Sequence, residues 1–169
     1  MIMRLCTSKR ASRALQDILE AETPSKARVF LLPFNTAMDS GREDRVFCPP
    51  TLSKVTAISQ YRWLGPSYVK DGKDAKETAE RAYKGATAIH ACVLQHAETN
   101  TNNFFREKFK SEGFVFDVLD IKSGEIQLVE VNPFGAVSGC GSPLFHWIRD
   151  AKVIYGLEGE VEVRITMEM

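Results

Sequence analysis

The stretch Phe114–Trp147, FVFDVLDIKSGEIQLVEVNPFGAVSGCGSPLFHW, decides the fold that we expect for this chain. Two largely apolar runs within it are each arranged around one acidic residue, Phe114–Leu119 around Asp117 and Ile126–Asn132 around Glu130. The segment Lys122–Glu125 between the two runs is made of residues that favour turns. Two alternating runs joined by a short turn are typical of an antiparallel hairpin. The sequence therefore predicts a hairpin here.

The register of this hairpin follows from the position of its turn. A turn at the Ser-Gly pair brings Ile121 opposite Ile126. Counting outward from that pair places Asp117 opposite Glu130. Opposed residues share a face of the sheet, and so do residues two apart on one strand. Asn132 is therefore expected on the same face as the two acids.

Two carboxylates that face each other repel, so one is protonated or both share a cation. Oxygen ligands suit Mg²⁺, and Mg²⁺ held by two carboxylates usually also holds phosphate oxygens. The alternative is that both acids point to solvent, as they do on many half-exposed hairpins. The metal site is favoured because Asn132 adds a third oxygen, Pro133 ends the strand and Gly135 permits a close turn. Repulsion also predicts that removing either acid leaves the metal-free protein at least as stable.

The same residues resemble the C-terminal signature of the cell division cycle protein 123 family. The resemblance is carried by Phe-Val-Phe-Asp, then Val-Glu-Val-Asn-Pro-Phe-Gly, then Ser-Pro-Leu-Phe-His-Trp. Members of this family have the ATP-grasp fold, bind ATP and Mg²⁺, and act as assembly factors for eukaryotic translation initiation factor two. The resemblance implies that Asp117, Glu130 and Asn132 are metal ligands, although the family more often has Asp at the middle position.

Upstream of the hairpin, the apolar run Arg28–Leu32 predicts a buried strand ended by Pro33. ATP-grasp proteins hold adenine against backbone groups of a hinge strand between two lobes. The resemblance places that hinge here and implies that the adenine-binding residues are Leu31, Leu32, Pro33 and Phe34. Without the resemblance, a simple core strand is the preferred interpretation.

A second hairpin is predicted from Glu43–Cys48 and Lys54–Gln60, with a turn at the two prolines between them. It resembles the family's Glu-Phe-Arg strand followed by an Ala-Ile-Ser-Gln strand. The resemblance implies that Arg45 lies beside the nucleotide phosphates, a role that suits a planar guanidinium. The alternative is a surface ion pair of Arg45 with Glu43 or Asp44.

Helical periodicity appears in three further segments. Apolar residues recur every three to four positions in Lys9–Ala21 and in the long segment Asp74–Ala97, which we expect to lie on the sheet. A second short helix is predicted over Asn102–Lys110 and is ended by Gly113.

The segment Glu160–Ile165 alternates cleanly and predicts a final strand with one buried face.

Length and composition exclude several classes of protein. With 22 Lys+Arg and 22 Asp+Glu, no net charge favours binding to nucleic acid or to a membrane surface. No apolar run is long enough to span a bilayer. The four cysteines are widely spaced and form no zinc-binding pattern, which is typical of reduced thiols in a cytoplasmic protein. The length of 169 residues suits a single domain over residues 1–169.

Together these segments predict an α+β fold. We expect an antiparallel sheet of about five or six strands, with helices packed on it and the hairpin of Asp117 and Glu130 at its centre. The resemblance implies the C-terminal part of an ATP-grasp-like fold, in a short member that lacks the N-terminal lobe. In the family, lysines of that lobe contact the phosphates and close over the nucleotide.

Three functions are open at this point. The first is an assembly factor that binds ATP and Mg²⁺ without turnover, with a subunit of translation initiation factor two as its protein partner. The second is an ATP-grasp ligase or kinase, and the third is a degenerate fragment that binds no nucleotide. The resemblance favours the first. A surface left bare by a missing lobe should be apolar enough to bind a protein partner or a second copy of the chain.

Overall fold

A computed structural model of the chain describes residues 9–20, 39–51, 54–62, 64, 69, 72–99, 103–121, 124–138, 141 and 143–167. The chain divides into two compact units, residues 1–35 and 36–169, and each is described by itself. The predicted strand Arg28–Leu32 lies outside the described residues. The single domain expected over residues 1–169 stays a prediction.

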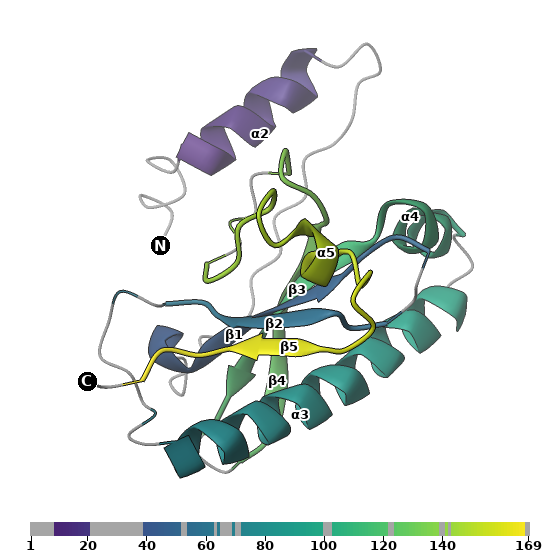
Figure 1. Cartoon of the computed structure of the whole chain (residues 1–169). Helices are drawn as coiled ribbons and strands as arrows, with labels where there is room; N and C mark the ends of the chain where they lie inside the picture. Colours follow the sequence, from purple (N-terminus) through teal and green to yellow (C-terminus); the bar gives the residue numbers. More distant parts are fainter. Residues whose placement is uncertain are drawn as a thin grey trace. The chain divides into compact units, whose positions relative to one another are not determined.

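The described part of the first unit is one helix, α2 (Lys9–Glu20; Figure 1). It confirms, to within one residue, the helix that periodicity predicted over Lys9–Ala21. Two leucines of its apolar stripe, Leu15 and Leu19, are exposed. The helix is thus amphipathic, as its sequence pattern indicated.

The second unit is built on a five-stranded sheet in the order β4-β3-β1-β2-β5 (Figure 1). The strands are β1 (Glu43–Cys48), β2 (Ala57–Gln60), β3 (Phe114–Asp120), β4 (Ile126–Pro133) and β5 (Glu162–Arg164). Neighbouring strands are antiparallel except β2 and β5, which are parallel. The α+β class is confirmed. Two details of the prediction are wrong: the sheet is mixed, and the β3–β4 hairpin lies at one edge rather than at the centre.

Long-range pairing explains both differences. Strand β1 pairs with β2 on one side and with β3 on the other, which leaves β4 at the edge. After β4 the chain passes through the short helix α5 (Ala151–Ile154) before it reaches β5 beside β2. Parallel neighbours need a crossover of this kind. Local alternation predicts that a strand forms, but it does not say which strand will be its neighbour.

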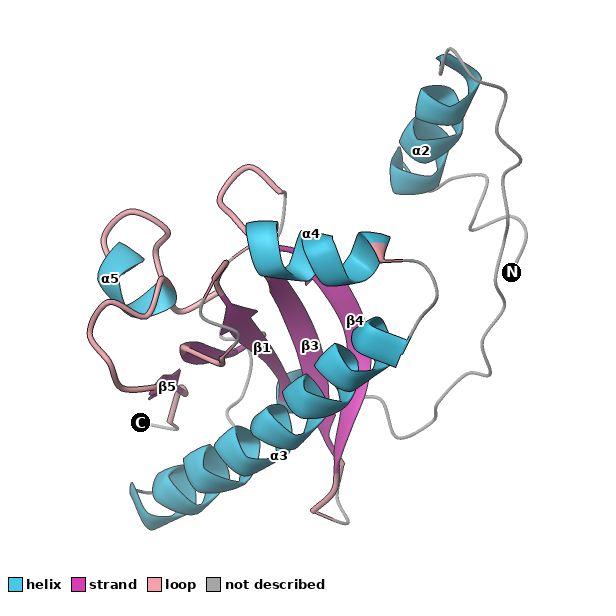
Figure 2. Cartoon of the chain, turned by 90° about the vertical axis from the view of Figure 1, so that its right-hand side faces the viewer, coloured by secondary structure: helices cyan, strands magenta, loops and turns pink. Residues whose placement is uncertain are grey.

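One face of the sheet is covered by α3 (Gly72–Thr99) and α4 (Phe104–Glu112; Figure 2). Helix α3 confirms the prediction over Asp74–Ala97 and is two residues longer at each end. Ala97 is one of its five buried residues, and the other four recur every four positions along one side: Thr78, Ala82, Ala86 and His90. Beneath it lies an apolar core from the sheet: Val46, Ile58, Phe116 and Val118. Gly113 ends α4 as predicted, with φ of 71°.

The opposite face is covered by the chain that follows β4. Three residues of this segment are buried on that face: Phe145, Val153 and Ile154. They pack on Phe47, Ala57 and Val115 of the sheet. Because both faces are covered, every residue of β3 is buried. The polar residues on this second face of the sheet form the candidate site.

Two sequence-based exclusions can be compared with the described residues. No helix among them combines the length and the apolar character that a membrane span requires. Cys48 and Cys92, the two cysteines described, are both free thiols. Burial raises the pKa of the Cys48 thiol far above its usual range, so this thiol is unreactive.

Candidate functional site

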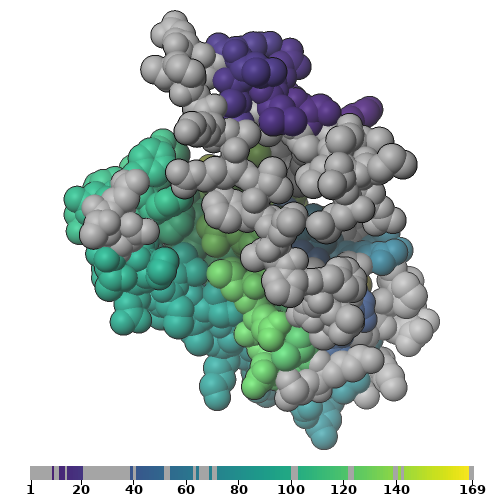
Figure 3. Space-filling view, turned by 180° about the vertical axis from the view of Figure 1, so that it is seen from behind, coloured from purple at the N-terminus to yellow at the C-terminus, as the bar shows by residue number. Residues whose placement is uncertain are grey.

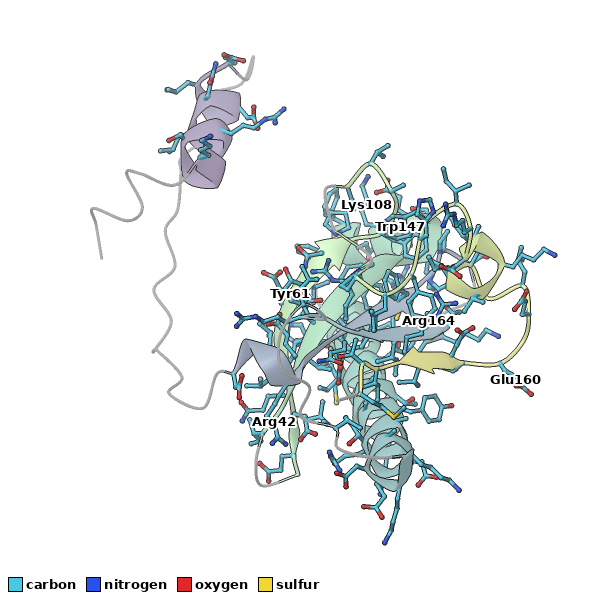
Figure 4. The ribbon with its side chains drawn as sticks, turned by 60° about the vertical axis from the view of Figure 1, so that its left-hand side comes forward. Arg42, Tyr61, Lys108, Trp147, Glu160 and Arg164 are labelled. Atoms are coloured by element: carbon cyan, nitrogen blue, oxygen red, sulfur yellow. The ribbon has the colours of Figure 1, made fainter. Side chains whose placement is uncertain are left out.

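A row of polar side chains crosses the face of the sheet that the segment after β4 covers. Residues paired across strands share a face. The pairing places five of them in one line, from β4 to β5: Glu130, Asp117, Arg45, Ser59 and Arg164. Figure 4 labels Arg164 from this row, and Trp147 from the segment that covers it. Three of the predicted site residues, Glu130, Asp117 and Arg45, are therefore neighbours on three adjacent strands.

The opposed pair of Asp117 and Glu130 is confirmed, but the turn that leads to it differs from the prediction. Next to the turn, Asp120 pairs with Ile126, so the predicted pairing of Ile121 with Ile126 is wrong. Ile121 instead belongs to the turn, where its N–H donates to the carbonyl of Glu125 (3.0 Å). The ladder begins one residue earlier on β3 than expected.

A β-bulge restores the predicted register at Asp117 and Glu130. The ladder shifts by one residue between Asp117 and Val118. Without that shift Asp117 would face Val129, and Glu130 would point to the face covered by α3. The sequence carries a signal for the bulge, because Leu128 and Val129 are consecutive apolar residues that break the alternation. Bulges often re-aim side chains, and this one brings Glu130 to the face of Asp117.

Asp117 and Arg45 form a buried, two-pronged ion pair at the centre of the row. Arg45 Nε donates to Asp117 Oδ1 (2.8 Å), and Arg45 Nη2 donates to Asp117 Oδ2 (2.7 Å). The side chain of Arg45 is 4% exposed and that of Asp117 is 0% exposed. The alternative of a surface pair with Glu43 or Asp44 is therefore wrong. Removing Asp117 would leave a buried guanidinium without its carboxylate at a cost of roughly 3–5 kcal/mol, so the structure predicts a less stable protein without this acid, contrary to the expectation from the sequence.

Two further groups hold the guanidinium of Arg45. Its Nη1 donates to the carbonyl of Gly141 (2.6 Å), in the Gly-rich loop after β4. The ring of Tyr61 lies against its face, with 4.6 Å between the guanidinium carbon and the ring centroid. Figure 4 labels Tyr61. The sequence pattern alone does not reveal this cation–π contact.

A third carboxylate lies close to the pair. Glu43 is two residues before Arg45 on β1 and shares its face. The pKa of Glu43 is raised to about 6. Burial is the largest cause, the charges of Asp117 and Glu130 also raise the pKa, and the charge of Arg45 lowers it by less. Burial also raises the pKa of Asp117, and the hydrogen bond from Arg45 opposes that effect. The site thus holds three acids and one guanidinium.

Asn132 is joined to the acids through Glu130. Its Nδ2 donates to Glu130 Oε1 (2.9 Å), which leaves the amide oxygen as the atom that a cation would take. Glu130 is exposed on the edge strand and Asn132 is half-buried. The three predicted ligands therefore share one face, with only oxygen atoms to offer, and the type of donor fits Mg²⁺.

The number of protein ligands at this place is small. In the part of the chain that the structure describes, no three His, Cys, Asp or Glu side chains are arranged to hold a metal ion. Both oxygens of Asp117 already accept hydrogen bonds from Arg45. A cation there would need Asn132 and ligands from outside the protein, which agrees with a metal that arrives bound to phosphate.

A second charged cluster, which sequence reasoning missed, lies on the α3 face. Asp120 is buried and accepts from Arg81 Nε (2.9 Å) and Nη2 (2.7 Å), and Arg42 lies 3.2 Å from it. Asp44 is also buried, and its Oδ2 atom has no hydrogen-bond partner among the residues that the structure describes. Burial and the neighbouring Asp120 raise the pKa of Asp44 to about 7. This cluster belongs to the packing of α3 on the sheet.

The remaining predicted site residues are those of the nucleotide hinge. Leu31, Leu32, Pro33 and Phe34 lie outside the described residues. Comparison of the sequence with models of known protein families and with curated proteins finds no match.

Proposed function

We propose that this protein binds ATP together with Mg²⁺ and acts, without turnover, as an assembly factor for a protein complex. The observation that carries the proposal is the direct opposition of Asp117 and Glu130 on the face that also holds Arg45. Opposed acids beside a guanidinium are suited to a cation and a phosphate in contact with each other. The resemblance to the cell division cycle protein 123 family, including its role with translation initiation factor two, points the same way.

Each residue has a role that follows from its chemistry. Asp117, Glu130 and the amide oxygen of Asn132 would hold the cation. Arg45 would bind phosphate oxygens, because its planar fork matches their spacing. Mg²⁺, when bound, would neutralise charge on the phosphates. The backbone of Leu31–Phe34 would meet the edge of adenine.

The charges in the row favour binding over phosphoryl transfer. Arg164, two strands from Arg45, is held by Asp150 (2.8 Å) and Glu162 (2.6 Å). Among the described residues of this row, Arg45 and Arg164 are the cations, and both are engaged with carboxylates. Phosphoryl transfer requires further groups that neutralise the developing charge. The ligase or kinase alternative is accordingly less well supported.

A surface for a protein partner is available on the other side of β4. A groove of about 790 Å³ lies between α3, α4 and β4 (Figure 3). It is lined mainly by apolar side chains, four of which are exposed: Phe104, Phe105, Leu128 and Val131. Exposed apolar patches of this kind commonly mark interaction sites. This groove supports the assembly-factor part of the proposal.

Thermal unfolding with and without Mg-ATP tests the nucleotide-binding part. Wild-type protein should melt roughly 3–5 °C higher when ligand exceeds its Kd about tenfold. Glu130→Gln should abolish the rise. Its ligand-free melting temperature should stay the same or increase, because Glu130 repels Glu43 and Asp117. Glu130 is the better residue to change, since Asp117 also holds Arg45.

Glu125→Gln provides the matched control, because Glu125 is an exposed acid in the turn of the same hairpin. It should respond to Mg-ATP as the wild type does. An equal rise in wild type and Glu130→Gln would show that nucleotide binds elsewhere and would overturn the site. Steady phosphate release from ATP by the wild type would favour the ligase or kinase alternative.

A further inference from the structure

Arg45 and a divalent cation compete for the same two atoms. Both Oδ atoms of Asp117 accept hydrogen bonds from Arg45, at 2.8 and 2.7 Å. A metal ion at Asp117 needs at least one of these oxygens. The pair is buried, so solvent water cannot readily replace Asp117 as the partner of the guanidinium when a cation binds. Each oxygen keeps a second lone pair, but a cation there would lie beside the buried positive charge of Arg45, so cation binding is opposed unless Arg45 changes partners.

We propose that Arg45 is a latch on the site. In the free protein it holds Asp117 and keeps cations out. A ligand that brings a divalent cation and phosphate groups together exchanges the partners, so that Asp117 binds the cation and Arg45 binds phosphate. The inference rests on the proposed function and specifies how the same site is regulated. Cation and polyphosphate bind together, and each binds poorly alone.

The local charge balance favours this exchange. Glu43, Asp117 and Glu130 contribute three negative charges when ionised and Arg45 contributes one positive charge, which leaves an excess of two negative charges. One divalent cation matches that excess. Once the cation takes Asp117, Arg45 needs a new anion, and phosphate oxygens accept its fork as well as a carboxylate does. Each half of the exchange thereby compensates the other.

Two other contacts of Arg45 are compatible with rotation of its guanidinium group. The ring of Tyr61 supports its face at 4.6 Å. A cation–π contact depends on the ring plane and not on one directed bond, so it tolerates rotation. The bond from Nη1 goes to the carbonyl of Gly141, which lies on a loop rather than on a strand. The two-pronged bond to Asp117 is thus the contact that the exchange must replace.

Binding of Mn²⁺ to the full chain, followed by the electron paramagnetic resonance signal of the free ion, tests the latch. No phosphate is present in this measurement. Arg45→Gln should bind Mn²⁺ about tenfold more tightly than the wild type, because it removes the competing guanidinium and its positive charge. The control is Arg164→Gln, which removes a positive charge from the same row two strands away and should leave Mn²⁺ affinity unchanged.

A second variant covers the case in which Arg45→Gln does not fold. Arg45→Lys keeps the charge but replaces the planar fork by a single ammonium, so it weakens the hold on Asp117. It should show a smaller increase in Mn²⁺ affinity, and the circular dichroism spectrum checks that it is folded. Equal Mn²⁺ affinity of the wild type and the folded Arg45 variants would overturn the latch.

The two proposals fail in different ways. If Mg-ATP raises the wild-type melting temperature but no Arg45 variant gains Mn²⁺ affinity, the latch is wrong and the proposed function stands. If Mg-ATP has no effect on the wild type but Arg45→Gln gains Mn²⁺ affinity, nucleotide binding is wrong. In that case Arg45 still blocks a cation site.

Discussion

Asp44 and Asp117 are buried aspartates on adjacent strands, and their charged neighbours have opposite signs. Asp117 faces a guanidinium that donates two hydrogen bonds to it, and these favour the ionised form. Asp44 faces Asp120, whose carboxylate already accepts from Arg81. Burial is the larger effect on Asp44 and raises its pKa to about 7. Asp44 is therefore mostly protonated in weakly acidic solution, whereas for Asp117 the hydrogen bond and charge of Arg45 oppose the rise in pKa that burial causes.

Asp44→Asn should stabilise the protein at alkaline pH and have little effect at acidic pH. The folded-state pKa of about 7 lies above the reference value of 3.8, so Asp44 favours the folded state less as the pH rises between these values. The loss amounts to at most roughly 4 kcal/mol, at about 1.4 kcal/mol for each pKa unit. Asparagine stays neutral, so the variant does not lose this stability as the pH rises. Urea unfolding at about pH 4 and about pH 8 measures the difference.

The control for this prediction is Glu98→Gln, which removes an exposed acid from the end of α3. Its stability relative to the wild type should change little between the two pH values. If Asp44→Asn and the wild type lose stability equally on going to alkaline pH, Asp44 is not the group that titrates.

At this scale the sequence predicted part of the site. Asp117, Glu130 and Asn132 were placed on one face because alternation fixes which side chains share a face. The partner of Arg45 could not be predicted, since it depends on β1 lying beside β3, 72 residues away along the chain. Asp44 was overlooked for the same reason. Besides burial, the acid that raises its pKa most is Asp120, which lies on the adjacent strand β3 but far away along the sequence.

At the scale of elements, the bulge in β4 and the small residues of α3 position the site. The bulge turns Glu130 toward Asp117. Helix α3 lies close to the sheet because its buried side carries small residues such as Ala82 and Ala86. Closest of all is Gly85, where an added Cβ would lie 2.2 Å from Cγ1 of Ile126 at the start of β4. The contact between α3 and β4 therefore depends on this glycine.

Gly85→Ala should destabilise the protein although alanine favours a helix by about 1 kcal/mol. Overpacking against Ile126 should cost about 1–3 kcal/mol, which exceeds the gain in propensity. Combining Gly85→Ala with Ile126→Ala should cost less than the sum of the two single changes, because the smaller side chain at position 126 relieves the clash that Gly85→Ala introduces. Denaturant unfolding of the four proteins gives the coupling energy.

Gly72→Ala is the matched control, since no atom lies within 4 Å of its added Cβ in the same helix. It should not destabilise the protein. Additive effects of Gly85→Ala and Ile126→Ala, or a stabilising Gly85→Ala, would contradict the close packing of α3 on β4.

At the scale of the whole molecule, the sequence predicted the α+β class and helices α2, α3 and α4, but not the short helix α5 or the order of the strands. Helices α2, α3 and α4 and the two hairpins follow from patterns within about 30 residues. The central place of β1 and the parallel entry of β5 arise from contacts between distant segments. The candidate row was consequently predicted only within its hairpin. Its full extent, from Glu130 to Arg164, required all five strands.

The measurement that tests the central claim most directly is a calorimetric titration of the full chain with ATP, once with Mg²⁺ and once with a chelator. Because the acids repel a free polyphosphate and Arg45 is held by Asp117, binding should appear only with Mg²⁺. With one phosphate-binding cation in the row, we expect a Kd above about 10 μM, weaker than roughly 7 kcal/mol. Binding of equal strength in the chelator, or no binding in either titration, would contradict the claim that this face holds Mg-ATP.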